Sequence, residues 1–245
     1  MSKNPLIDFI RFLLIILVIL VHIVHFGDLH PNVKSMILAF MMPTFLVITG
    51  FLVNIDKPLK EFGVYLLKIT LPYVIMVCCY MVVSLYLPVR DGVQNLDLST
   101  FYNVLFITSI GPYWFFKVMM LCGVCYYLVF NVKKKQEPVR GNEVFVRYVM
   151  FGSLLLLLSR YTPFLSADSA VYYFIGVGLR LFVKDFKKVC VGTFWAGFPL
   201  LIMLSNTAWR AWGEIYVLFC VMCFLAVATK LFQYCNGKRL SNIYM

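Results

Sequence analysis

The chain has few charged residues, and its only sizeable hydrophilic stretch is the loop from Asn131 to Glu143. Of its 245 residues, 13% are charged and 62% are hydrophobic, whereas a soluble domain has about 25% charged and 45–50% apolar residues. This composition excludes an ordinary soluble protein. Since the bilayer offers no water to the backbone, each span must be a helix of about 20 mostly apolar residues. The sequence therefore predicts an all-α, polytopic transmembrane helix bundle.

Motifs that mark several classes of soluble enzyme are also missing. Gly176 and Gly178 lie inside an apolar run rather than after a strand, so they do not form a phosphate-binding loop. Two Cys-x-x-Cys pairs lie in apolar segments without a loop to enclose a metal, Cys122/Cys125 and Cys220/Cys223. The sequence therefore predicts no metal site.

Eight apolar runs are interpreted as spans of one membrane-embedded domain over residues 1–245. They cover about 9–27, 35–53, 64–88, 102–130, 144–159, 170–184, 188–206 and 211–234. Lys and Arg accumulate in cytoplasmic loops. With a cytoplasmic N-terminus, thirteen cations fall on the inner side and four on the outer side, so both termini are predicted to face the cytoplasm. The net charge of +11 then reflects loops that contact anionic membrane lipids, and no nucleic-acid partner is expected.

The first run, "DFIRFLLIILVILVHIVHFG", contains Arg11, His22 and His25. An arginine at the centre of a span costs about 2.5–3.5 kcal/mol, so polar residues here point to function. Eleven residues separate Arg11 from His22, which places them on one helix face within about 20° and about 16 Å apart. They cannot touch, so a long ligand must lie between them if they act together. His25 is a weaker candidate, because on one continuous helix it lies about 60° round from His22.

Each of these residues also has a structural explanation. Arg11 can extend to the inner headgroups or pair with Asp8, and His22 can be a hydrogen-bonded packing residue. Glu214 follows Arg210 by four residues and can simply pair with it. The sequence alone leaves both kinds of role open.

Five segments, taken in order, resemble the integral-membrane acyltransferase family 3. The stretch "DFIRFLLIILVILVH" is similar to the family's first helix, with its D-x-x-R start and Arg-x10-His spacing. "MMPTFLVITGFLV" resembles the second helix, M-P-x-F-F-x-x-S-G-F, and "LLKITLPYV" resembles the entry to the third, with Lys68 where arginine is usual. "GPYWFFKVMMLCGVCYYLVF", with Trp114, and "VYYFIGVGL" resemble later helices. The resemblance covers about residues 5–180.

This resemblance implies transfer of an acyl group, usually acetyl, from cytoplasmic acetyl-CoA to a hydroxyl of a cell-envelope glycan or lipid-linked sugar. Acyl-CoA is then a co-substrate rather than a permanent cofactor, and the expected location is the bacterial inner membrane. By this resemblance, Arg11, helped by Lys57, Lys60 or Lys68, is expected to hold the CoA phosphates. The thioester is then expected to reach His22, whose imidazole would act as the general base.

Acceptor binding is expected at the outer face of the membrane. Tyr113 and Trp114 are the aromatic candidates there, and Glu214 and His25 are the polar ones. Aromatic rings stack on sugars, but tryptophan and tyrosine also anchor helices at both membrane interfaces. The two aromatic residues therefore also have an explanation as anchors.

Family members are longer and have a late S-L-x-I-Y-L-x-H helix, whereas this sequence ends at "KRLSNIYM". The comparison predicts that one or two final helices are missing. Two other functions stay open: a proton- or anion-coupled transporter or flippase that uses the same Arg11 and His22, and an inactive shortened relative that serves as a partner subunit. The ordered segments favour the enzyme, and no inverted repeat supports transport.

Overall fold

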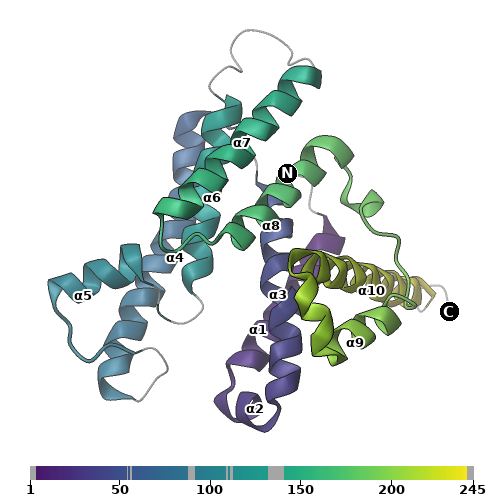
Figure 1. Cartoon of the computed structure of the whole chain (residues 1–245), viewed down its shortest axis with the longest axis horizontal. Coiled ribbons are helices and arrows are strands. Elements are labelled where there is room, and N and C mark those ends of the chain that lie inside the picture. The colour runs from purple at the N-terminus through teal and green to yellow at the C-terminus, as the bar shows by residue number, and fades with distance from the viewer. Residues whose placement is uncertain are drawn as a thin grey trace. The chain divides into compact units, whose positions relative to one another are not determined.

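The computed structural model describes residues 4–53, 55, 57–87, 92–108, 110, 113–131 and 141–241. Every regular element in these ranges is a helix, which confirms the all-α prediction (Figure 1). The chain forms two compact units. The first unit is the N-terminal part up to Phe51 together with the part from Gly178 onward, and the second is Leu52–Val177. One domain over residues 1–245 stays a prediction.

The first unit begins with three successive helices, α1 (Pro5–His22), α2 (Val24–Leu29) and α3 (Pro31–Leu52). The later elements of the same unit are η3 (Leu179–Val183), η4 (Phe186–Lys188), α9 (Gly197–Ser205), η5 (Thr207–Trp212) and α10 (Glu214–Ser241). Helix α1 starts where the Asn4 side chain accepts a hydrogen bond from the Leu6 N–H at 3.2 Å, with Pro5 in the first turn. Its buried residues recur at helical spacing: Leu6, Ile7, Ile10, Leu14 and Val21.

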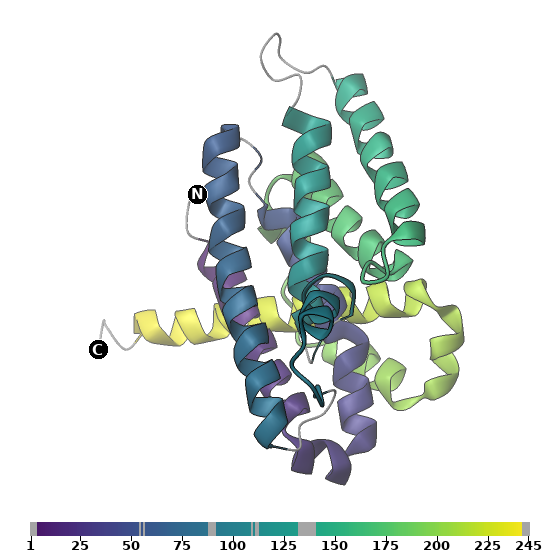
Figure 2. The same ribbon diagram turned by 90° about the vertical axis from the view of Figure 1, so that its left-hand side faces the viewer.

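The long helix α10 holds the first unit together. Its Phe224 packs on Phe40 of α3 with ring centroids 4.9 Å apart, and its Phe232 packs on Phe9 of α1 at 5.6 Å. Figures 1 and 2 show α10 running across α3. Gly213, with φ +54°, makes the turn from η5 into α10.

The second unit contains α4 (Leu59–Tyr86), α5 (Leu98–Tyr102), the π-helical η1 (Asn103–Ile107), α6 (Trp114–Asn131), α7 (Gly141–Tyr161) and α8 (Ala167–Gly178). The last residue of α8, Gly178, already belongs to the C-terminal part of the first unit. Helix α6 packs against both α4 and α7. One apolar cluster joins α4 to the segment around η1: Tyr73, Val77, Met81, Val104, Leu105 and Ile110.

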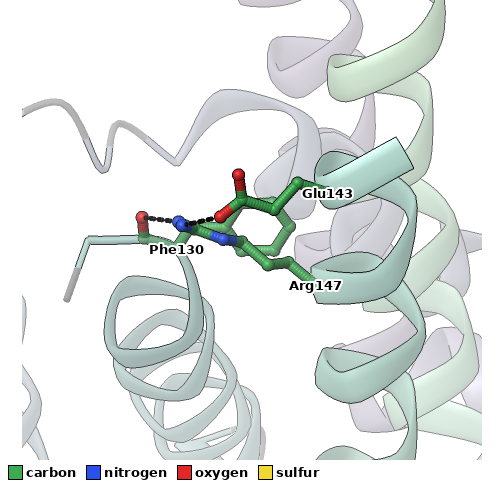
Figure 3. A network of polar contacts seen from close by, with 3 residues as sticks. All are labelled: Phe130, Glu143 and Arg147. Atoms are coloured by element: carbon green, nitrogen blue, oxygen red, sulfur yellow. Dashed lines mark hydrogen bonds and ion pairs between the residues drawn. The ribbon is translucent and has the colours of Figure 1, made fainter. Parts of the chain in front are cut away.

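Arg147 fastens α7 to the end of α6. Its guanidinium donates to the Phe130 carbonyl at 2.9 Å and to Glu143 Oε1 at 2.5 Å (Figure 3). The first bond gives a partner to a carbonyl in the last described turn of α6, and carbonyls in the last turn of a helix need a partner from outside the helix. Arg147 is buried and its charge is balanced by Glu143, so this cation, which the sequence predicts on the inner side, has a structural role.

Two predicted helices are wrong in their extent. The run at 9–27 breaks at Ile23, whose backbone is extended (φ −70°, ψ 110°), so α1 ends at His22. The run at 102–130 is divided between α5 with η1 and α6. Pro112 stands in the sequence between them, and proline removes a helical N–H and restricts the residue before it.

Six helices in the described part of the chain are long and apolar enough to cross a membrane. They are Pro5–His22, Pro31–Leu52, Leu59–Tyr86, Trp114–Asn131, Asn142–Tyr161 and Glu214–Asn236. The predicted run at 170–184 forms α8 and the short η3, and the run at 188–206 is helical in α9 only over its last part. The fold class is thus confirmed, and the count of eight spans is not.

Candidate functional site

Arg11 and His22 lie on one uninterrupted helix. Because α1 is continuous from Pro5 to His22, the two residues stay about 16 Å apart along its axis and about 20° apart around it. Both side chains are exposed. Arg11 and Asp8 do not form an ion pair, and no other carboxylate in the described part of the chain lies within 4.0 Å of the Arg11 guanidinium. Among the residues that the structure describes, none compensates the Arg11 charge.

The His22 ring is held in one tautomer by its own helix. Nδ1 lies 2.7 Å from the Val18 carbonyl oxygen, one turn earlier. A carbonyl can only accept, so Nδ1 carries the proton and donates it. In the neutral imidazole, Nε2 then has a free lone pair. The arrangement supplies an oriented base on an exposed face.

His25 does not belong to α1. It lies on the short helix α2, after the break at Ile23. The expected 60° offset from His22 on a common helix is therefore wrong, because the two residues no longer share a helix axis. The His25 side chain is exposed.

A polar cluster lies where η5 meets α10. The Arg210 guanidinium donates to Ser35 Oγ at 2.8 Å and does not pair with Glu214. Glu214 Oε2 is buried without a hydrogen-bond partner in the described part of the chain, and the buried Tyr216 hydroxyl lies beside Arg210 and Cys220. Buried polar atoms normally find partners, because leaving one unsatisfied costs about 1–3 kcal/mol. The sequence indicated Glu214 by its position, but nothing in the sequence marked Tyr216.

The other sequence-predicted residues lie in the second unit. Lys57 places its ammonium 5.3 Å from the centre of the Tyr65 ring, a cation–π contact. Lys60 and Lys68 are exposed on α4. Tyr113 packs edge-on against Tyr80 at 6.0 Å, and Trp114 begins α6. The structure thus gathers Arg11, His22, His25 and Glu214 in the first unit and the remaining candidates in the second.

Lys117 is a buried cation that sequence reasoning missed. It is 6% exposed, it lies on the candidate span α6, and its ammonium donates to the carbonyls of Val104, at 3.3 Å, and Thr108. Its third neighbour is the Phe164 ring, 5.5 Å from Nζ. No carboxylate in the described part of the chain pairs with it. The sequence feature that could have identified Lys117 is a single lysine inside an apolar run.

The segment from Arg180 to Lys188 combines cations with a strained turn. Arg180 donates to the Phe51 carbonyl at 3.0 Å. Lys184 (φ 64°, ψ −39°) is the centre of a γ-turn closed by the Asp185 N–H to the Val183 carbonyl at 2.7 Å. A γ-turn with positive φ is rare, and such backbone strain costs about 1–3 kcal/mol at a residue other than glycine.

The described residues contain no cluster of three or more His, Cys, Asp or Glu side chains that could hold a metal ion. What the chain offers instead is an oriented imidazole on α1, uncompensated cations on both units, and two buried polar atoms near the start of α10. These groups are suited to proton transfer and to anion binding.

Comparison with known proteins agrees with this chemistry. The sequence model of a family described as an acyltransferase domain, acyltransferase family 3, matches residues 4–243. No curated protein and no solved structure matches. The match extends the resemblance from about residues 5–180 to nearly the whole chain. The chain therefore belongs to acyltransferase family 3 and is a membrane acyltransferase.

Proposed function

We propose that this acyltransferase moves an acetyl group from cytoplasmic acetyl-CoA to a hydroxyl of a cell-envelope glycan or lipid-linked sugar, with His22 as the general base. The observation that carries the proposal is the Nδ1–Val18 hydrogen bond, which leaves Nε2 free to accept a proton. A neutral imidazole is a suitable base because its ordinary pKa lies near working pH.

The chemical step needs only this imidazole. Nε2 takes the proton of the acceptor hydroxyl as the oxygen attacks the thioester carbonyl carbon. The tetrahedral intermediate then breaks the C–S bond, and the departing CoA sulfur takes the proton back from the imidazolium. The products are the acetyl ester and free CoA, and His22 is again neutral.

The distance between Arg11 and His22 fits the shape of acyl-CoA. CoA carries its phosphates at one end and its thioester at the end of a long flexible arm. Arg11 binds a phosphate, since a planar guanidinium can donate two parallel hydrogen bonds to it. The arm then follows α1 for about 16 Å to His22. Lys57, Lys60 and Lys68 add cations on the second unit.

The acceptor hydroxyl binds toward the far end of α1 from Arg11. Glu214 Oε2 is buried with no hydrogen-bond partner in the described part of the chain and can bond to a sugar hydroxyl. Tyr113, Trp114 and His25 are further acceptor-side residues in this proposal. The membrane is the bacterial inner membrane, where cytoplasmic acyl-CoA and envelope precursors are both accessible.

His22→Asn is the variant that tests the base. The asparagine amide N–H can still donate to the Val18 carbonyl, but it has no basic lone pair in place of Nε2. Protein level and helix content should be unchanged, whereas O-acetyl groups on the host's surface glycans, measured by mass spectrometry, should fall by about 10²-fold or more. His30→Asn, on the exposed end of α2, is the matched control.

Acetylation that persists in His22→Asn at the wild-type level would exclude His22 as the base. Deleting the gene gives a second readout. Glycans that keep every acyl group after deletion would reject the proposed function and favour the transporter or the partner subunit. Arg11→Lys should weaken acetyl-CoA binding although it keeps the charge, because the bidentate contact is lost.

A further inference from the structure

The segment from Arg180 to Lys188, which contacts the end of α3, carries a group of cations that the proposed catalytic step does not use. Arg180 donates to the Phe51 carbonyl at 3.0 Å, and Phe186 packs edge-on against the Phe51 ring at 5.0 Å. Both contacts belong to the first unit, and together they hold the segment from Arg180 to Lys188 around the last turn of α3. Phe186 is buried, and its neighbours Lys184, Lys187 and Lys188 are exposed.

These cations lack compensating charge. Asp185 is the only acid in the segment, and its carboxylate accepts the Lys187 backbone N–H at 3.0 Å. No carboxylate in the described part of the chain lies within 4.0 Å of the Arg180, Lys184, Lys187 or Lys188 charge. The Arg180 bond to Phe51 uses one of its five N–H groups and leaves others for a ligand.

The backbone of the segment is also under strain. The γ-turn at Lys184 puts a long side chain at positive φ, where glycine is favoured. Such strain persists only where the surroundings impose it, and it gathers at binding sites. Here the turn follows η3 directly, and it lies between the two residues that contact Phe51, Arg180 before it and Phe186 after it.

We propose that Arg180, Lys184, Lys187 and Lys188 bind the phosphate groups of acyl-CoA. This inference rests on the proposed function, and it names the part of the donor that Arg11 alone does not neutralise. CoA carries a diphosphate and a 3′-phosphate, more negative charge than one guanidinium can balance. By the predicted orientation, this segment and Arg11 both face the cytoplasm, where acyl-CoA is found. The same phosphate chemistry occurs in anionic lipid headgroups, so the test separates these two sources.

The test measures CoA binding to the full chain in phosphatidylcholine nanodiscs. The variant combines Lys184→Gln, Lys187→Gln and Lys188→Gln. It keeps Arg180, because the Arg180 hydrogen bond to the Phe51 carbonyl joins the segment to α3. The control combines Lys133→Gln, Lys134→Gln and Lys135→Gln in the hydrophilic loop, which removes the same charge. We expect the Kd for CoA to rise about tenfold or more in the variant and to change less than about twofold in the control. The salt dependence of CoA binding should also become weaker in the variant.

One further ligand identifies which phosphate is held, and phosphatidylglycerol vesicles test binding to lipid headgroups. Dephospho-CoA, which lacks the 3′-phosphate, should bind the wild type more weakly than CoA and should lose less affinity in the variant. Wild-type affinity of the variant for CoA would overturn the proposal. Loss of binding only to phosphatidylglycerol vesicles would likewise overturn it and assign the segment to lipid headgroups.

The outcome also separates this inference from the proposed function. If the wild type binds CoA and His22→Asn abolishes acetylation, but the lysine variant behaves like wild type, only the inference fails. If the wild type does not bind CoA, the proposed donor and this inference are both wrong.

Discussion

Replacement of Lys117 by methionine tests whether a buried lysine can stabilise a membrane helix without a carboxylate partner. Methionine keeps the length and flexibility of the side chain but removes the ammonium. The carbonyls of Val104 and Thr108 then lose their donor, and the contact with the Phe164 ring loses its charge. The change therefore removes all three described contacts of the ammonium at once.

The size of the effect follows from two opposing terms. A hydrogen bond from a charged donor contributes about 1.5–3 kcal/mol, and the cation–π contact about 0.5–2 kcal/mol. Removing the ammonium also removes the cost of burying a charge, which offsets several kcal/mol of the stabilisation from these contacts. Because two carbonyls are left unsatisfied, we expect a net loss of about 2–4 kcal/mol in the free energy of unfolding.

Thermal unfolding of the full chain in detergent measures this loss. For a chain of this size the midpoint should fall by about 5–15 °C. Hydrogen exchange should also become faster in residues 98–108, since Lys117 fastens this segment to α6. Lys68→Met on the exposed face of α4 should change the stability by no more than about 0.5 kcal/mol. An unchanged or higher midpoint for Lys117→Met, with unchanged exchange in residues 98–108, would refute the reasoning and show that desolvation outweighs the contacts.

Four other substitutions test single features of the structure. Tyr173→Phe should leave the thermal midpoint unchanged or raise it, because the buried hydroxyl has no hydrogen-bond partner; a clear drop would mean that the hydroxyl is bonded. Lys184→Gly should raise the thermal midpoint, because glycine adopts positive φ without strain, and it should weaken CoA binding. A lower midpoint would contradict the claim that the backbone at Lys184 is strained. Arg147→Met should cost about 1–3 kcal/mol, measured as SDS or thermal unfolding, because it leaves the Phe130 carbonyl without its donor, whereas the exposed Glu143 is solvated. The pKa of Asp97 is lowered by hydrogen bonds from Thr100 and Ser99, so the stability from this cap is present above the ordinary pKa of 3.8 and is lost as pH falls through the lower folded-state pKa. In Asp97→Ala, hydrogen exchange of residues 98–102 should therefore be fast at neutral pH as well as at low pH. Equal exchange in the variant and the wild type at neutral pH would argue against the cap.

The sequence determined which segments are helical and which family the chain belongs to. Long apolar runs leave the backbone no alternative to a helix in lipid, so most spans could be placed from composition and length. The spacing between Arg11 and His22 could also be worked out in advance, because it depends only on a continuous helix between them. The family followed from motifs that are local in the sequence.

The tertiary structure decided what depends on contacts between distant residues. The break at Ile23, which separates His25 from His22, has no strong local signal, since an isoleucine fits a helix as well. The same holds for Lys117, whose partners lie nine and thirteen residues away, and for Arg180, which bonds to a residue 129 positions earlier. The tautomer of His22 needed the position of one carbonyl oxygen. Composition and periodicity specify which residues face inward, but only the folded chain specifies which polar atoms meet.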